Sequence, residues 1–352
     1  MTHAVPLSIE SFVRRLSAVL AVLVLTAGAV AQDAPALDRT TAEAEAVAAS
    51  VDVRTAQLDL DAARREAARV EADPTSLRVA LLRARHEVEA AEDALRNARA
   101  AARDAGADAF EAALQARDGV AVASTALDIA RTEADAARIR LEAGAATEND
   151  VARADDVARS AERDLADAER RFALALDRLA QAIGRDEAPG RLVEPVADPN
   201  VPSLASVLER ATENASLRAA LRAVRLAEAQ LAAVDIAFTS ARADVEAAED
   251  AVATARLRAD DLAETLRLSL RQAHDAVLAA DARRVSAEEA LATADEDVSV
   301  AVARFDAGSI SQVVLERTRL ERLRRRAELH TARIGYADAL RSLDAAVLGV
   351  AR

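Results

Sequence analysis

RLEAG at residues 140–144 and RFDAG at residues 304–308 are the two stretches that decide the fold. Each carries a long helical pattern to a glycine, and a new helical pattern begins a few residues later. A glycine in the left-handed conformation commonly ends a helix in this way. We therefore predict that the chain reverses direction at Gly144 and again at Gly308, so that each glycine forms the tip of a helical hairpin.

The two stretches are separated by a numbering offset of 164 (308 − 144), and this offset extends beyond them. DVRTA at residues 52–56 aligns with SLRAA at residues 216–220 at the same offset. The first half ends near Gly184 and the second near Gly349, one residue later. A repeat of this length is far longer than a solenoid unit. The chain is therefore predicted to be a tandem duplication of one large unit.

The composition favours long helices over a compact core. Of the 352 residues, 52% are hydrophobic but only 2% are aromatic, and most of the apolar content is alanine. A chain rich in alanine, leucine, arginine and glutamate is typical of long helices and coiled coils. The net charge is −14, with both signs interspersed and no long basic tract, which argues against nucleic-acid binding. The absence of cysteine excludes disulfides and thiolate metal sites.

Residues 1–31 have the pattern of a secretory signal peptide. Arg14 and Arg15 precede an apolar run over residues 16–27, and the small-residue pattern of a cleavage site follows at residues 29–31. The apolar run is short for a membrane span, although an uncleaved N-terminal anchor is the alternative interpretation. We expect an exported protein of the periplasm or outer membrane.

Residues 32–184 form the first predicted repeat. A helical pattern over about residues 41–72 is interrupted at Asp73-Pro74, because the residue before a proline disfavours the helical conformation. Ser76 is then the expected cap of a long helix that runs to Ala143, with a soft spot near Gly106 or Gly119. About 68 residues at 1.5 Å each make a rod of roughly 100 Å.

The helix that returns from the first tip has the clearest periodicity in the chain. Thr147 or Asn149 is its expected cap. Apolar residues recur every seven positions in two interleaved sets, which predicts a coiled-coil seam narrow enough for close helix approach. An amphipathic membrane-surface helix is the competing interpretation, but the seam is narrow and the chain acidic. The two sets are Val151, Ala158, Leu165, Phe172, Leu179 and Ala154, Ala161, Ala168, Ala175, Ala182.

Residues 185–202 are predicted to be a linker, because several prolines within this short stretch exclude a helix. Residues 203–352 form the second predicted repeat, with helix resuming at Ser203. A weak spot at residues 235–239 precedes a second rod over about residues 240–307, and a last helix covers about residues 312–347. Each repeat would thus consist of a short helix, a break, a long helix, a glycine tip and a short returning helix.

The sequence offers no pattern for catalysis, a cofactor or a metal. The four histidines show no ligand spacing, and zinc sites require clustered ligands. Neither a nucleophile elbow nor a phosphate-binding glycine loop is present. A basic cluster at residues 322–326 is interpreted as a solvated helix face beside Glu316, Glu321 and Glu328, with contact to an acidic partner as the alternative.

The tips and the duplication together resemble the outer-membrane efflux protein (TolC) family. The resemblance rests on the pattern from Arg140 to Gly144 followed by Asp150-Val151, and on its second copy, RFDAGSIS at residues 304–311 followed by Leu315. It covers almost all of residues 41–350. It implies three subunits that form a hollow α-helical tunnel across the periplasm, capped by a membrane barrel. It also implies a periplasmic adaptor, which docks at the helical tips, and an inner-membrane pump.

The chain departs from the family pattern where the membrane strands should lie. Two strands per repeat are implied between the short first helix and the long helix, but these positions hold residues 73–75 and 235–239. A membrane strand needs roughly 9–11 residues of alternating character, with aromatic girdles at the membrane surfaces. The chain has five Phe, one Tyr and no Trp. We therefore expect an all-α relative: long antiparallel coiled-coil hairpins in a TolC-like α-barrel with little or no β structure.

The expected function is that of a conduit component of a cell-envelope efflux or secretion system, without catalysis and without a cofactor. The expected partners are two further copies in a homotrimer, a periplasmic adaptor and an inner-membrane pump. The alternative is a periplasmic coiled-coil spacer or tether that transports nothing. By the resemblance, the adaptor-docking residues are Arg140, Gly144, Val151, Arg304, Gly308, Ser311 and Leu315.

Overall fold

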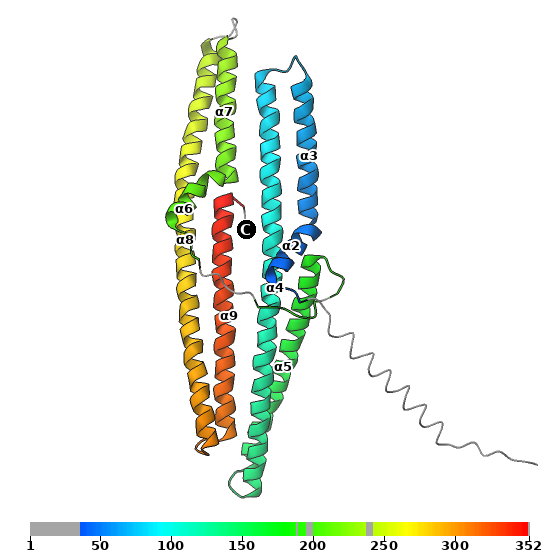
Figure 1. Cartoon of the computed structure of the whole chain (residues 1–352), viewed down its shortest axis with the longest axis vertical. Coiled ribbons are helices and arrows are strands. Elements are labelled where there is room, and N and C mark those ends of the chain that lie inside the picture. The colour runs from blue at the N-terminus through cyan, green and yellow to red at the C-terminus, as the bar shows by residue number, and fades with distance from the viewer. Residues whose placement is uncertain (1–35, 188, 195–199, 237–241, 351–352) are drawn as a thin grey trace, which may run out of the picture.

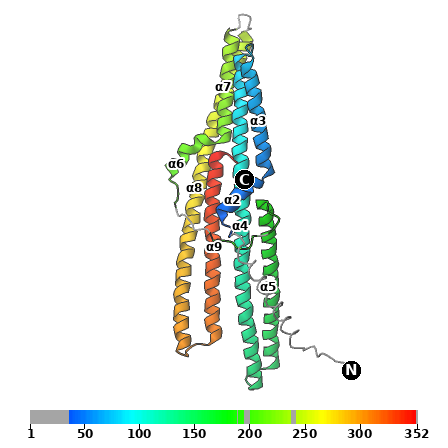
Figure 2. The ribbon, with the colours of Figure 1, turned by 45° about the vertical axis from the view of Figure 1, so that its right-hand side comes forward.

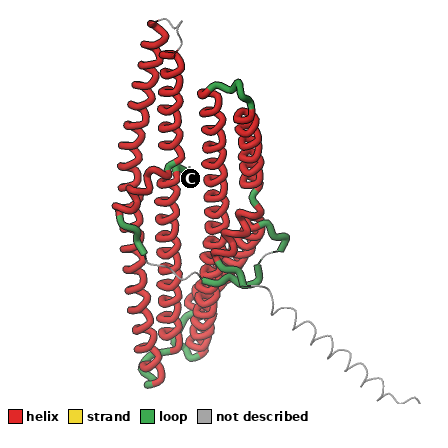
Figure 3. The backbone as a smooth tube through the Cα atoms, turned by 45° about the horizontal axis from the view of Figure 1, so that its top comes forward, coloured by secondary structure: helices red, strands yellow, loops and turns green. Residues whose placement is uncertain are grey.

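The computed structural model describes residues 36–187, 189–194, 200–236 and 242–350 as an elongated bundle of helices (Figure 1). The signal peptide predicted over residues 1–31 lies outside the described residues. Within the described part, Figure 3 shows helices and loops but no strand, which confirms the predicted all-α class. The elements are α2 (Arg39–Ala49), α3 (Val51–Ala72), α4 (Arg78–Glu142), α5 (Glu148–Ile183), α6 (Leu204–Glu209), η1 (Arg210–Glu213), α7 (Ala215–Ile236), α8 (Arg242–Asp306) and α9 (Gln312–Leu348).

The helices repeat at a constant offset in the numbering. The first residues of α3 and α7 differ by 164 (215 − 51), and the same offset separates α4 from α8 and α5 from α9. The long helices α4 and α8 have 65 residues each, so each is about 98 Å long at 1.5 Å per residue. Each long helix packs against two shorter ones, α3 and α5 for α4, and α7 and α9 for α8. Figures 1 and 2 show the shorter pair placed end to end along the long helix.

The seam predicted for α5 lies on the face that packs against α4. All ten residues of its two heptad sets are buried or half-buried, whereas most of the intervening residues are exposed. The second repeat uses the same positions, because Leu179 and Ile183 are buried at one end of α5 and their equivalents Leu343 and Val347 are buried at the matching end of α9. Apolar contacts recurring at this period therefore hold the first hairpin together, whereas the matching positions of α9 include Arg322 and Arg325.

The expected helix over residues 41–72 is broken at Ser50. The backbone of Ser50 is extended, and its hydroxyl accepts a hydrogen bond from the amide of Val53 at 3.3 Å, so that it caps α3. Asn214 makes the matching break before α7, where its side-chain oxygen accepts from the amides of Ser216 and Leu217. The break lets α2 turn across the middle of α4 and contact both α4 and α5.

The long helix α4 is continuous through Gly106, so the soft spot expected there is wrong. Gly106 instead allows α2 to approach α4 closely. A Cβ atom at this position would lie 2.7 Å from the Cβ of Ala46 and 2.8 Å from the carbonyl oxygen of Ala42. The expected cap Ser76 is also displaced, because α4 begins after Leu77, which makes no side-chain capping bond.

Gly106→Ala is expected to lower the free energy of unfolding by about 1–3 kcal/mol, the usual cost of overpacking a tight contact. Gly119→Ala on the same helix is the matched control, because nothing lies within 4 Å of a Cβ atom there. It should raise the free energy of unfolding by roughly 0.5–1 kcal/mol, since alanine favours helix over glycine. Urea unfolding followed by circular dichroism measures both, and a stabilised Gly106→Ala would contradict the close approach.

A strap of linker residues covers the middle of the first repeat. Leu37 forms a parallel β-bridge with Leu192, with hydrogen bonds from Leu37 to Arg191 at 2.8 Å and from Val193 to Leu37 at 2.9 Å. Beneath it lies an apolar cluster that contains the fully buried Phe110. No helix among the described residues has an apolar stretch long enough to cross a bilayer.

Candidate functional site at the helical tips

The first tip, residues 140–151, closes α4 with a Schellman motif. Gly144 has φ +72° in the left-handed region, which a side chain would disfavour. The amide of Ala145 donates to the carbonyl of Arg140 at 2.7 Å, and the amide of Gly144 donates to the carbonyl of Leu141 at 2.9 Å. The outer bond of this motif is accepted by the backbone carbonyl of Arg140, so the motif itself does not require an arginine at this position.

The second tip, residues 304–315, repeats this geometry. Gly308 has φ +70°, the amide of Ser309 donates to the carbonyl of Arg304 at 2.9 Å, and the amide of Gly308 donates to that of Phe305 at 2.8 Å. The hydroxyl of Ser309 adds a further bond to the Arg304 carbonyl at 2.8 Å. The two reversals predicted at these glycines are therefore present, with matching backbone bonds.

The next helix starts with a side-chain cap at each tip. Thr147 forms a capping box with Asp150, in which the amide of Asp150 donates to the Thr147 hydroxyl at 3.2 Å and the amide of Thr147 donates back at 2.9 Å. Of the two expected caps, Thr147 is the one observed. Hydrogen bonds from the amide and the hydroxyl of Thr147 lower the pKa of Asp150. Ser311 occupies the same place before α9 and accepts from Val314.

Both tips lie at the same end of the molecule (Figures 1 and 2). An ion pair joins the two hairpins near this end, since Arg317 on α9 donates to one oxygen of Glu133 on α4 at 2.5 and 3.0 Å. Next to the first tip, Arg138 on α4 bonds Asp155 on α5 at 2.6 Å. The two reversals are thus presented side by side, as one composite end surface.

The residues predicted for docking divide by exposure. Five are exposed at the end surface, and no atom lies within 4 Å of a Cβ atom built on either glycine. Val151 is half-buried, and Leu315 is only 4% exposed, so the Leu315 side chain holds α9 against its own chain. The exposed five are Arg140, Gly144, Arg304, Gly308 and Ser311.

The two repeats meet where α4 packs against α7 and α9, a contact we call the internal junction. All the ion pairs across this contact have the same arrangement, in which the acidic residue lies on α4 and the basic residue lies on α7 or α9. Among them Asp93 accepts from Arg222 at 3.0 Å, and both side chains are less than a tenth exposed. The pairs are Glu89 with Arg222 and Arg225, Asp93 with Arg218 and Arg222, Asp104, Asp108 and Glu111 with Arg341, Asp118 with His330, and Glu133 with Arg317.

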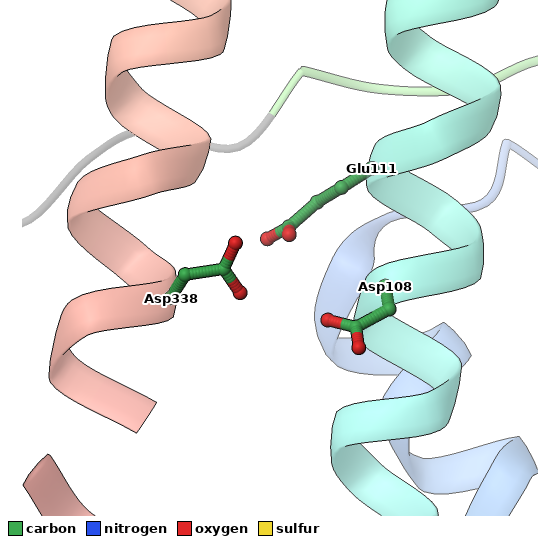
Figure 4. A group of neighbouring side chains, drawn as sticks. All are labelled: Asp108, Glu111 and Asp338. Atoms are coloured by element: carbon green, nitrogen blue, oxygen red, sulfur yellow. The ribbon is translucent and has the colours of Figure 1, made fainter. Parts of the chain in front are cut away.

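Three carboxylates gather at the middle of the internal junction. In Figure 4, Asp108 and Glu111 extend from α4 toward Asp338 on α9, and their oxygen atoms approach within 4.8 Å of one another. Such a group could suit a cation, but Arg341 bonds all three, with Asp108 and both oxygens of Glu111 at 2.9 Å. Burial would lower the pKa of Arg341, but its bonds to Glu111 and the charges of Asp338 and Asp108 raise it. The guanidinium is therefore the cation of this cluster.

A second polar group joins the linker to the internal junction. Glu194 accepts from Arg117 at 2.7 Å and from Arg326 at 2.8 Å, and His330 lies between Glu194 and Asp118. Burial would raise the pKa of Asp118, but its hydrogen bonds and charge interactions with His330 and Arg117 lower it. The contacts of the linker residue Glu194 could not be predicted from the sequence, because its partners Arg117, Arg326 and His330 are far from it along the chain.

The basic cluster at residues 322–326 is neutralised within the chain, as the solvated-face interpretation expects. Arg325 pairs with Glu321 and Glu328 at 2.9 Å, and Arg324 lies 3.7 Å from Glu321. Arg326 differs from its neighbours, because it reaches the linker residue Glu194. These residues therefore contribute to the fold and leave little unpaired positive charge for an acidic partner.

Comparison with solved structures finds bacterial membrane proteins, among them proteins described as outer membrane channels. The CmeC outer membrane channel of Campylobacter jejuni matches with a TM-score of 0.64 at 12% identity, over 88% of this chain and 85% of CmeC. A membrane protein from Pseudomonas aeruginosa gives 0.62 at 17% identity over 88% and 92%. The outer membrane protein VceC from Vibrio cholerae gives 0.60 at 15% identity over 89% and 96%. No family model and no curated relative matches the chain. The resemblance to TolC-type channels is thus confirmed at the level of the fold.

Proposed function

We propose, from the fold that this chain shares with outer membrane channels, that it is a conduit component of a cell-envelope efflux or secretion system. The observation that carries the proposal is the fold match over 88% of the chain to CmeC, a protein described as an outer membrane channel. The Ala-lined hairpins supply slender walls, and the sequence offers no catalytic constellation. We infer that three copies enclose a periplasmic α-helical tunnel.

The arrangement of the repeats supports a ring. Two repeats stand side by side in one chain, joined at the internal junction, and the same kind of contact repeated between chains would add further repeats in one rotational direction. Contacts of this head-to-tail type close into rings when the rotation per unit divides a full turn. Three chains would contribute six repeats, with the tips of all six at one end.

We place adaptor docking at the end surface formed by both tips. Its exposed residues include Arg140, Arg304 and Ser311, and the glycines leave room above the backbone. A photo-crosslinking residue in place of Ser309 should capture an envelope adaptor in cells, whereas one in place of exposed Arg65 on α3, far from the tips, should not. Capture of the same protein from both positions would contradict docking at the tips.

Native mass spectrometry of the exported chain in detergent tests the conduit itself. The expected mass is three times that of one chain, and negative-stain images should show a ring around a central opening. A monomeric thin rod would contradict the conduit and would instead support a coiled-coil spacer or tether that transports nothing. Adding lipid distinguishes assembly in solution from assembly that requires a membrane.

A further inference from the structure

The duplication gives every residue of the internal junction a counterpart in the other repeat, at the numbering offset of 164 (308 − 144). The acidic face of α4 corresponds to a face of α8, and the basic faces of α7 and α9 correspond to faces of α3 and α5. In Figures 1 and 2, α8 lies at one edge of the molecule and α3 and α5 lie at the opposite edge. The counterpart faces are therefore turned away from each other within a single chain.

The counterpart of a buried ion pair is a pair of exposed leucines. Asp93 corresponds to Leu257 (257 − 93 = 164), and Arg222 corresponds to Leu58 (222 − 58 = 164). Leu257 is 70% exposed and Leu58 is 68% exposed, whereas Asp93 and Arg222 are 5% and 8% exposed. Both members of the pair have changed from charged to apolar, so that the two positions still match each other chemically.

The same change is found lower on both faces. Asp104 and Asp338, which lie near Arg341, correspond to the exposed residues Leu268 and Leu174. Asp118 and His330, which contact each other, correspond to Ala282 and Ala166. Isolated exposed leucines need no explanation, but a line of them that matches a second line at equivalent heights does.

The counterpart faces carry charge at several levels, because Arg218 and Arg225 correspond to Arg54 and Asp61, and Arg341 corresponds to Asp177. Glu133 and Arg317 correspond to Asp297 and Arg153, so an ion pair of the same polarity is available near the tips. Glu111 and Arg341 correspond to Asp275 and Asp177, which are both acids. The counterpart faces therefore lack the central arginine cluster, and at that level they repel each other.

We infer that the outward face of α8 binds the α3 and α5 face of a second copy, with Leu257 of one copy packed against Leu58 of the next. This inference rests on the proposed ring and specifies its register and chemistry. Junctions between copies are apolar at the levels of Leu257 with Leu58 and of Ala282 with Ala166, where the junction within each chain is ionic. Salt at 1 M screens the internal ion pairs and also the Asp275–Asp177 repulsion. The association of copies should therefore persist, or tighten, at high salt.

Cysteine pairing tests the register, because the natural chain has no cysteine. A Leu58→Cys, Leu257→Cys double variant should form disulfides between copies on mild oxidation and yield a covalent trimer. Disulfide formation requires Cα atoms within about 7 Å, whereas one heptad along a helix is about 10.5 Å. Leu58→Cys with Leu268→Cys, on the same face at the wrong height, is the matched control and should not crosslink. Either single variant should stay unlinked, since a head-to-tail contact never brings two identical residues together.

Charge exchange tests the chemistry without oxidation. Leu58→Arg alone should weaken association at least tenfold, because it places a guanidinium against Leu257 and beside Arg54, the counterpart of Arg218. Adding Leu257→Asp recreates the Asp93–Arg222 pair between copies and should restore association to within a few-fold, now weakened by salt. Both sites are exposed in one chain, so helicity should be unchanged and serves as the folding control.

The outcomes separate this inference from the conduit. If the wild-type chain proves to be a monomer, both the proposed conduit and the proposed contact between copies are wrong. A trimer that does not link residues 58 and 257, or in which the double charge variant is as weak as Leu58→Arg alone, would overturn the register while the conduit stands. Linking through Leu58→Cys alone would indicate a two-fold dimer and would overturn the head-to-tail contact.

Discussion

Replacing Arg341 with methionine is expected to lower the free energy of unfolding by about 3–5 kcal/mol, the cost of leaving a buried charge without its partner. Arg341 bonds both oxygens of Glu111 at 2.9 Å, and Glu111 is only 3% exposed. Methionine keeps much of the side-chain volume and packs adaptably, so the loss reflects charge more than a cavity. Urea unfolding followed by circular dichroism gives the difference.

Two controls make this result specific. The double variant Glu111→Gln, Arg341→Met should recover much of the loss, because it also removes the buried Glu111 carboxylate, whose remaining partner is Arg39 at 3.5 Å. Arg325→Met on the same helix removes an arginine from exposed pairs, which contribute only about 0–1 kcal/mol. Equal losses in Arg341→Met and Arg325→Met would contradict the burial of charge at the internal junction.

Phe110→Ala is expected to lower the free energy of unfolding by about 3–5 kcal/mol, because it removes a fully buried aromatic ring and leaves a cavity. Phe110 is 0% exposed and packs in a cluster with Leu37, Leu179 and Leu192. This cluster ties the strap of linker residues to α4 and α5. The amides of Leu37 and Val193, which bond across the strap, should therefore exchange with solvent faster in the variant.

Leu77→Ala is the control for Phe110→Ala, because Leu77 is 75% exposed just before α4. Its truncation should change the free energy of unfolding by less than about 0.5 kcal/mol. Urea unfolding measures stability, and hydrogen exchange with mass spectrometry locates the change. A loss below about 1 kcal/mol for Phe110→Ala, with unchanged exchange in the strap, would show that the cluster is not what anchors the linker.

The long helices and their tips could be predicted because their causes are local. Gly144 and Gly308 end helices through backbone bonds that reach back by no more than five positions. The seam of α5 follows from a seven-residue period within one segment. Most helix bounds therefore follow from the sequence to within a few residues, and the extended spot expected at 235–239 falls largely outside the described residues.

The middle of the molecule could not be predicted, because its causes are contacts between distant segments. Ser50 breaks a segment whose composition is helical on both sides, and the break is useful only because α2 crosses at Gly106. The partners of Arg341 on α4 are separated from it by 230 and 233 positions in the sequence. Charged residues occur on every helix face of this chain, so pattern alone cannot distinguish a buried arginine from a solvated one. The burial of Leu315 was not predicted either, because it depends on how the helices pack against one another.

Each long helix crosses the whole molecule without a break, while the short helices meet near its midpoint, where α2 and η1 also pack. A long, straight helix that pivots about its midpoint moves its two ends in opposite directions. For a bar of about 98 Å, a tilt of roughly five degrees about the middle would move each end by about 4 Å, in opposite directions. The side chains packed at half height would be the pivot of such a tilt, and the tips and the far ends would then move in opposite directions.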